Sequence, residues 1–210
     1  RESLKEREVI KKIASNITTP LPFIIPYQKS LRPKWLIKLG LFLYDNIGGK
    51  ITIPKSSTVN IKKEMPNILK DQFKIGFQYY DLQVDDKKLV QLNVEDAKKK
   101  GATIIQNRKV IDAKRNKNTW DITLDDNTIL QSKILINAAG PWINEVLSNV
   151  IKLNSKKSIR LVKGSHIITK SLYSQKKAFT LQNEDNRIIF VIPYKAVSYT
   201  HLRAHETSLH

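Results

Sequence analysis

Apolar residues recur at helical spacing in three segments of the chain. One amphipathic helix is expected over residues 2–15, where apolar side chains fall near one face among charged residues: Leu4, Val9, Ile10 and Ile13. A second helix is predicted for 34–46, which ends before a pair of glycines. A third helix, which the pair Asp85-Asp86 can cap, should stop at Gly101.

The second of these helices is unusually apolar and is flanked by lysines. Such a helix is either buried in a core or lies against a membrane surface. Burial is the more common arrangement, so a buried helix is predicted here.

Shorter apolar runs between turn residues predict strands. They are expected at 23–25, 74–83, 102–105, 108–114, 119–124, 128–131 and 133–136, with a hairpin of 178–181 and 188–192. The run Ile134–Ile136 reads as a buried strand, and a helix should follow from Trp142 to about Ile151. Helices and strands in this order favour an α/β or α+β fold.

Composition narrows the classes of protein. The 210 residues are enough for one large or two small domains, and 40% apolar content is enough for a core. There is no cysteine, which excludes disulfides and thiolate metal sites. No apolar run approaches the roughly 20 residues of a membrane span. The net charge of +18 comes mostly from scattered lysines without interleaved aromatic residues, so no nucleic-acid partner is expected.

The last sixteen residues differ in composition from the Lys-, Ile- and Asn-rich chain before them. His201 and His205 lie four residues apart, a spacing that could place both on one helical face as metal ligands. Residues 195–210 show no amphipathic period, however. We interpret them as a foreign or frame-shifted tail and expect no metal site.

The stretch 133–142 is the most informative segment. An apolar run leads into Asn-Ala-Ala-Gly-Pro-Trp, with Pro141 where a helix would begin. A strand, a small-residue turn and a helix N-terminus form a place where a large cofactor can approach the backbone. By itself, without the rest of the chain, the stretch favours an ordinary turn of an α/β protein.

Five further stretches extend the pattern in sequence order. Three precede 137–142: Leu-Arg-Pro-Lys-Trp at 31–35, Gly-Leu-Phe-Leu-Tyr-Asp at 40–45 and Asp-Leu-Gln-Val-Asp-Asp at 81–86. Two follow it: Ile-Arg-Leu-Val-Lys-Gly-Ser-His at 159–166 and Leu-Gln-Asn-Glu-Asp-Asn-Arg-Ile-Ile-Phe-Val-Ile-Pro-Tyr at 181–194. In this order and approximate spacing they closely resemble the FAD-dependent, aerobic glycerol-3-phosphate dehydrogenase family. The resemblance runs from about Arg1 to Tyr194.

The resemblance implies a two-domain α/β flavoenzyme, with a dinucleotide-binding domain and a substrate domain built on an antiparallel sheet. It implies oxidation of sn-glycerol 3-phosphate to dihydroxyacetone phosphate, with electrons passing through FAD to a quinone. It further implies a peripheral protein, possible as a homodimer, on the cytoplasmic face of the bacterial inner membrane. The chemistry needs a base for the C2 hydroxyl proton and cations for the phosphate.

The resemblance also assigns residues. His166 is the candidate catalytic base in contact with substrate, although a lone strand histidine is more often structural. Lys163 and Arg160 are candidate substrate-binding cations, with solvated surface charge as the alternative. The candidate FAD contacts are Val110, Ala138, Ala139, Gly140 and Trp142. Tyr79, Tyr80 and Asp81 receive no role.

One family feature does not occur in the sequence. None of the seven glycines are spaced as Gly-x-Gly-x-x-Gly, the fingerprint that holds a dinucleotide pyrophosphate. The chain is therefore interpreted as an internal fragment that alone binds FAD weakly or not at all and has no turnover. Four parts are expected: 1–82 mostly of the substrate domain, 83–152 of the FAD-binding domain, 153–194 again of the substrate domain, and the tail.

Two other functions stay open at this point. The first is a basic, non-catalytic module that binds nucleic acid or an anionic membrane. The second is an amino-acid-oxidase-like flavoenzyme, which shares the general fold.

Overall fold

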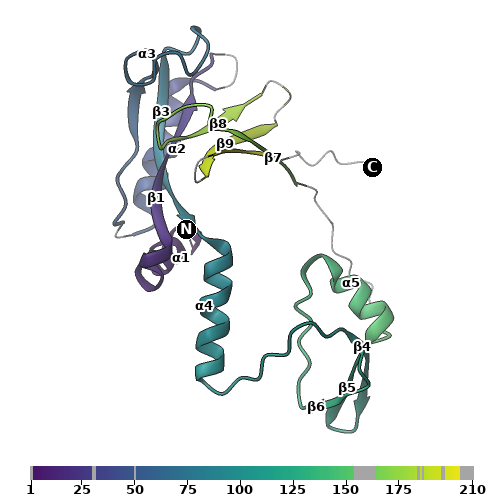
Figure 1. The fold of residues 1–210 in the computed structure, drawn as a ribbon. Coiled ribbons are helices and arrows are strands. Elements are labelled where there is room, and N and C mark those ends of the chain that lie inside the picture. The colour runs from purple at the N-terminus through teal and green to yellow at the C-terminus, as the bar shows by residue number, and fades with distance from the viewer. Residues whose placement is uncertain are drawn as a thin grey trace. The chain divides into compact units, whose positions relative to one another are not determined.

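The computed structural model describes residues 2–29, 32–49, 51–153, 164–183, 185, 187–194 and 197–203 (Figure 1). The chain forms two compact units, which we call unit 1 (residues 1–93 and 163–210) and unit 2 (residues 94–162). Helices and strands are mixed along the chain, as expected for the α/β class. The expected boundaries of the four parts stay predictions.

Unit 1 is built on a seven-stranded sheet. Its strands, in spatial order, are β2 (Ser57–Asn60), β3 (Ile75–Val84), β1 (Thr18–Pro26), β8 (Ala178–Gln182), β9 (Ile188–Tyr194), β10 (Val197–Arg203) and β7 (Gly164–Lys170). β1 and β8 are parallel, whereas the other neighbouring strands are antiparallel. The sheet therefore joins the beginning of the chain to its last third.

β1 lies inside the sheet although it contains three prolines: Pro20, Pro22 and Pro26. Just past its end, the Tyr27 N–H donates to the Ile75 carbonyl at 2.9 Å, so odd-numbered positions direct their backbone groups toward β3. The prolines are at even positions and face the β8 side, where pairing is confined to Phe23 and Ile24. A residue without an N–H is tolerated there because no ladder bond requires it.

The predicted hairpin of β8 and β9 is confirmed. The two strands pair from Phe179 opposite Val191 to Gln182 opposite Ile188. The Asn183 N–H donates to the Arg187 carbonyl at 2.9 Å, and the Arg187 N–H donates to the Asp185 carboxylate at 3.0 Å. β10, which lies in the segment interpreted from sequence as a foreign or frame-shifted tail, pairs with β9 and β7.

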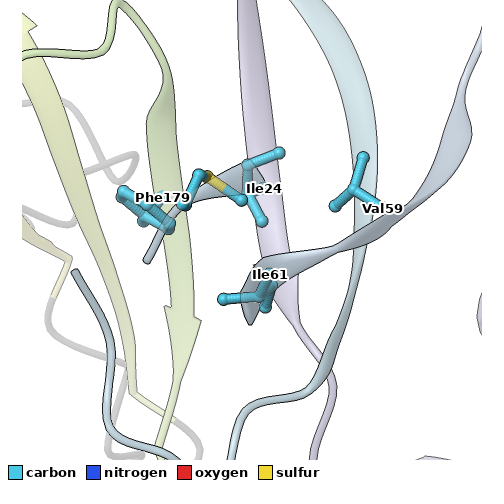
Figure 2. Packing of buried hydrophobic residues seen from close by; sticks show 5 residues of the cluster. Ile24, Val59, Ile61 and Phe179 are labelled. Atoms are coloured by element: carbon cyan, nitrogen blue, oxygen red, sulfur yellow. The ribbon is translucent and has the colours of Figure 1, made fainter. Parts of the chain in front are cut away.

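The core of unit 1 lies on one face of this sheet (Figure 2). Five buried residues from β1, β2, β8 and the following short helix form it: Ile24, Val59, Ile61, Met65 and Phe179. Phe73 and Tyr173 pack against them, and the Tyr173 and Phe179 rings meet edge to face with centroids 5.2 Å apart. Burial of these apolar side chains is the main source of stability for the unit.

Three predicted helices are confirmed with small shifts at their ends: α1 (Glu2–Ile13), α2 (Lys34–Ile47) and α4 (Asp86–Lys99). The Asp85 carboxylate caps α4 by accepting from the Lys88 N–H at 3.1 Å. A 3-10 turn η1 (Ser15–Ile17) and a one-turn helix α3 (Ile61–Glu64) complete unit 1. Among the described helices, none combines the length and apolarity needed to cross a membrane.

α1 buries only part of the predicted apolar face, with Leu4 and Ile10 half-buried. Val9 and Ile13 are 46% and 73% exposed, whereas Arg7 is only 7% exposed. The Arg7 guanidinium donates to the Tyr44 hydroxyl and lies 5.2 Å from the ring centroid of that tyrosine. It also donates to the Tyr80 carbonyl at 3.4 Å. Polar partners on α2 and β3 thus determine which side of α1 faces inward.

α2 contradicts the prediction of a buried helix. None of its residues is buried, and Trp35, Leu39 and Phe42 are 66%, 46% and 61% exposed. The inward side carries Tyr44, whose hydroxyl donates to the Tyr80 carbonyl at 2.9 Å. The helix is attached along one side by polar as well as apolar contacts, which leaves an apolar stripe on the other side.

Unit 2 holds a three-stranded antiparallel sheet of β4 (Val110–Asn116), β5 (Thr119–Leu124) and β6 (Ile129–Ser132), as the sequence predicted. The predicted helix after Trp142 is confirmed as successive turns of different pitch. These are a 3-10 turn η2 (Gly140–Trp142), an α-helical turn α5 (Ile143–Glu145) and a π-helical turn η3 (Val146–Val150).

Two strands predicted in unit 2 do not form. Residues 102–105 and 133–136 have no regular structure, and Ile134 and Ile136 are 74% and 81% exposed. Prediction of a buried strand at 134–136 is therefore wrong for this structure. An apolar run becomes a strand only when another strand completes its hydrogen bonds, and neither run pairs with a strand among the described residues.

Candidate functional site

The turn at 137–142 is held together by the side chain of Asn137. Its Oδ1 accepts from the Ala139 N–H at 3.2 Å, and its Nδ2 donates to the Ile143 carbonyl at 3.0 Å. The Trp142 N–H donates to the Ala139 carbonyl at 3.1 Å, which closes the 3-10 turn. One asparagine thus satisfies backbone groups on both sides of the turn.

The backbone of this turn is open on the side of Gly140. Gly140 has a φ of 54°, and no atom lies within 4 Å of the position that a Cβ would occupy. Ala138 and Gly140 are exposed, and Ala139 is half-buried. Small side chains and open space allow a flat ligand to approach the peptide groups closely.

Trp142 and Val110 lie in the same unit. Trp142 is 65% exposed beside the turn, and Val110 is 37% exposed at the first position of β4. The β4–β5 register shifts directly after Val110, which marks a β-bulge. The preceding residue, Lys109, accepts from the Asp125 N–H at 2.9 Å through its carbonyl, so the start of the strand is fixed.

Of the other candidate residues, His166 belongs to unit 1. His166 lies on β7, is exposed and stands opposite His201 of β10 in the antiparallel register. Lys163 and Arg160 lie outside the described residues. The structure therefore groups the candidate FAD contacts in unit 2, and the roles of all these residues stay predictions.

The groups with the largest pKa shifts belong to the framework of unit 1. Burial, followed by the charge of Asp81, raises the pKa of Tyr44 to about 12. Burial also raises the pKa of Tyr173 to about 12 and that of Tyr79 above its usual value. Tyr79 shares a 3.0 Å hydrogen bond with Thr180 and stacks on Phe23 at 5.4 Å. These tyrosines hold strands and helices together.

The Glu8 carboxylate is another framework group. Burial alone would raise its pKa, but hydrogen bonds from Thr52 and the charges of Arg7 and Lys11 lower it below the usual value. The Thr52 hydroxyl donates to Glu8 at 2.6 Å, and the Thr52 N–H donates at 3.0 Å. No group of three or more metal-ligating side chains gathers within the described residues.

Comparison with known proteins places this turn in a family context. A family described as "FAD dependent oxidoreductase" matches residues 1–206. This chain belongs to that family. The match covers both units, so the open turn in unit 2 and the sheet of unit 1 are parts of one flavoprotein architecture.

Three curated relatives are similar to this chain over more than nine tenths of its length. D-erythritol 1-phosphate dehydrogenase of Brucella abortus is 40% identical over 201 residues, which are 93% of this chain and 40% of that protein. Glycerol-3-phosphate dehydrogenase of Pseudomonas aeruginosa is 41% identical over 92% of this chain and 38% of that protein. Aerobic glycerol-3-phosphate dehydrogenase of Escherichia coli is 38% identical over 92% of this chain and 39% of that protein. The chain thus spans about two fifths of their length.

Solved structures show the fold. Glycerol-3-phosphate dehydrogenase from Bacillus halodurans complexed with FAD has a TM-score of 0.70 at 22% identity, over 96% of this chain and 38% of that one. L-proline dehydrogenase from P. horikoshii has a TM-score of 0.65 at 14% identity, over 98% of this chain and 55% of that one. The fold is thus shared with an enzyme named for an amino acid. The sequence matches favour the polyol-phosphate dehydrogenases over that alternative and over a basic binding module.

FAD is the cofactor of the family, and the turn in unit 2 fits it. The open space at Gly140 and the exposed, small Ala138 suit a flat isoalloxazine or adenine ring. The sequence analysis assigned no role to Asn137. Asparagine side chains commonly hydrogen-bond the backbone two residues further on, so an Asx-turn could have been predicted at this position.

Proposed function

We propose that this sequence is part of an enzyme that oxidises the secondary alcohol of sn-glycerol 3-phosphate to dihydroxyacetone phosphate. The carrying observation is the identity of about 40% with dehydrogenases of polyol phosphates over more than nine tenths of the chain. FAD supplies the chemistry by taking a hydride from C2, while a base takes the hydroxyl proton.

In this proposal the residues of unit 2 hold the cofactor. Ala138, Ala139 and Gly140 present backbone to a FAD ring, and Trp142 and Val110 add apolar contact. His166 accepts the hydroxyl proton, and Lys163 and Arg160 bind the substrate phosphate. The support is the open backbone at Gly140 in the structure and the family motif Lys-Gly-Ser-His at 163–166.

The substrate is tested by comparing two polyol phosphates. Glycerol 3-phosphate and D-erythritol 1-phosphate both carry a phosphate ester and neighbouring hydroxyls, and relatives at similar identity are named for each. We expect the longer polypeptide that contains this sequence to reduce an artificial dye with glycerol 3-phosphate. If only D-erythritol 1-phosphate reduces the dye, the proposed substrate is wrong but the proposed class of reaction is right. The 210-residue chain alone should bind FAD weakly and show no turnover.

The proposal includes a quinone as electron acceptor and a peripheral location on the cytoplasmic face of the bacterial inner membrane. The support is α2, whose exposed Trp35, Leu39 and Phe42 form an apolar stripe close to Lys34 and Lys38. Apolar side chains flanked by lysines suit the interface of an anionic bilayer. A homodimer is also proposed, and light scattering of the purified protein tests it.

A further inference from the structure

A basic pocket lies in unit 1 where β1 ends and β3 begins. Its volume is about 530 Å³, within the range of small-molecule sites. Three lysines, Lys29, Lys34 and Lys74, line it together with the aromatic rings of Tyr27 and Phe73. Among the described residues, no carboxylate lines it, and the other lining residues are two glutamines and an isoleucine.

Three separate segments supply the lysines, and hydrogen-bonded backbone holds two of them. The Tyr27 N–H donates to the Ile75 carbonyl at 2.9 Å, which fixes the chain just before Lys29 and just after Lys74. The Lys74 carbonyl itself accepts from the Ile61 N–H at 3.1 Å. The sheet register therefore brings Lys29 and Lys74 to the same pocket, although they are distant in sequence.

The aromatic walls of the pocket are also fixed. The Lys34 Nζ lies 5.1 Å from the centroid of the Tyr27 ring, in the geometry of a cation–π contact. The Tyr27 ring meets the buried Phe77 edge to face at 6.0 Å, and Phe73 packs against the core cluster. A ligand would thus meet positive charge beside rigid apolar surface.

Charge balance distinguishes this pocket from its surroundings. Elsewhere in unit 1, Lys62 pairs with Asp71 at 3.1 Å and Lys177 pairs with Glu64 at 3.3 Å. Within the part of the chain that the structure describes, none of the three pocket lysines forms an ion pair. Like charges that are gathered without a counter-charge repel one another, and a bound anion removes that repulsion.

We propose that this pocket binds a phosphate ester group, either of a free phosphate compound or of an anionic lipid headgroup. Three lysines match the charge of a phosphate, and the two rings accommodate the carbon skeleton attached to it. The residues that line the pocket belong to unit 1, whereas the candidate FAD-contacting turn belongs to unit 2. The proposal does not depend on the dehydrogenase function.

The test is a titration of the 15N-labelled 210-residue chain with inorganic phosphate, followed by the amide shifts of Gln28, Lys29 and Lys74. We expect saturable shifts, with affinity about tenfold lower in a variant with Lys29→Gln, Lys34→Gln and Lys74→Gln. The control carries Lys87→Gln, Lys88→Gln and Lys98→Gln on the exposed side of α4, with the same change in net charge. Circular dichroism verifies that each variant is folded.

A second arm separates the two sources of phosphate. Co-sedimentation is measured with vesicles of phosphatidylglycerol and of phosphatidylcholine. Pocket-dependent binding of inorganic phosphate supports a free phosphate ligand, and pocket-dependent binding of phosphatidylglycerol vesicles alone supports a lipid headgroup. If the pocket variant and the α4 control lose both kinds of binding equally, the positive charge acts non-specifically and the proposal is wrong.

Discussion

At the scale of single residues, Gly140 carries the proposed contact with FAD. Its positive φ of 54° is less favourable for residues that carry a Cβ, and the space beside it is open. Gly101 offers a matched control, since it has a φ of 91° and nothing within 4 Å of its Cβ position, but ends a helix far from the turn in sequence. The two glycines separate backbone strain from ligand contact.

Gly140→Ala in the longer polypeptide should weaken FAD binding about tenfold or more, because a methyl group enters the space where the ring approaches the backbone. Gly101→Ala should lose a similar stability of about 1 kcal/mol but retain its affinity for FAD. Fluorescence titration with FAD measures both. Equal affinities in the two variants would contradict a flavin contact at Gly140.

Buried tyrosines make the stability of unit 1 sensitive to alkali. Burial raises the pKa of Tyr44 and of Tyr173 to about 12, whereas an exposed tyrosine titrates near 10. The unfolded chain therefore loses these protons at lower pH than the folded chain. The stability from the two neutral phenols is complete below about pH 10 and is lost as the pH rises toward 12.

We expect the urea midpoint of unfolding to fall between about pH 10 and pH 12. Tyr173→Phe should lower the midpoint at neutral pH and flatten this fall, because the phenol that titrates differently in the two states is absent. Circular dichroism in urea at a series of pH values measures the effect. If the urea midpoint of the variant falls by the same amount, Tyr173 does not contribute to the loss of stability at high pH.

At the scale of elements, Gly76 shows how tightly β3 packs. A Cβ at this position would lie 2.9 Å from Ile24 Cγ2, 3.1 Å from Ile61 Cδ1 and 3.3 Å from the Ile25 carbonyl oxygen. Gly40 lies inside α2, and a Cβ there would meet nothing within 4 Å. Substitution by alanine should therefore change the free energy of unfolding in opposite directions at the two positions.

Gly76→Ala should lower the free energy of unfolding by about 1–3 kcal/mol through overpacking of the core. Gly40→Ala should raise it by about 0.5–1 kcal/mol, because alanine favours the helix and restricts the unfolded chain. Urea denaturation of both variants provides the comparison. Stabilisation by Gly76→Ala would show that β3 and the core are looser than the structure indicates.

The exposed stripe on α2 predicts where a membrane would be contacted. Leu39→Ser with Phe42→Ser should reduce co-sedimentation with anionic vesicles by about tenfold, because two apolar side chains no longer enter the interface. Val90→Ser on the exposed surface of α4 is a control outside the stripe, since Val90 is 63% exposed. Unchanged sedimentation of the α2 variant would place the membrane contact elsewhere.

Local patterns were sufficient for some elements and insufficient for others. α1, α2, α4 and the hairpins carry their own periodicity, caps and turns, so the sequence predicted them. The face that α1 buries depends on Tyr44 and Tyr80, residues distant in sequence, and periodicity placed Val9 and Ile13 inside instead. β2 is a four-residue strand that becomes recognisable only beside β3.

The candidate site shows the same division. Small residues and a glycine were enough to predict the turn at 138–140. The open space beside Gly140 and the hydrogen bonds of Asn137 depend on the three-dimensional structure and could not be predicted. The run 134–136 looked like a buried strand because it is apolar. Its burial would require a neighbouring strand, which the described residues do not provide.

At the scale of the whole molecule, the chain belongs to the FAD-dependent oxidoreductases and spans about two fifths of the curated relatives it matches. Unit 2 exposes large apolar side chains, Ile134, Ile136 and Trp142 among them. Apolar exposure of this extent is typical of surfaces that other polypeptide covers. We therefore propose that the activity requires a longer polypeptide that contains this sequence.

The most direct measurement is the anaerobic reduction of bound FAD by sn-glycerol 3-phosphate in that longer polypeptide. We expect the visible absorbance of oxidised flavin to be lost on addition of the substrate, and His166→Ala to slow this loss by at least about a hundredfold. Retention of FAD content in the His166 variant serves as the control. Flavin that stays oxidised with glycerol 3-phosphate and with erythritol 1-phosphate alike would contradict the proposed function.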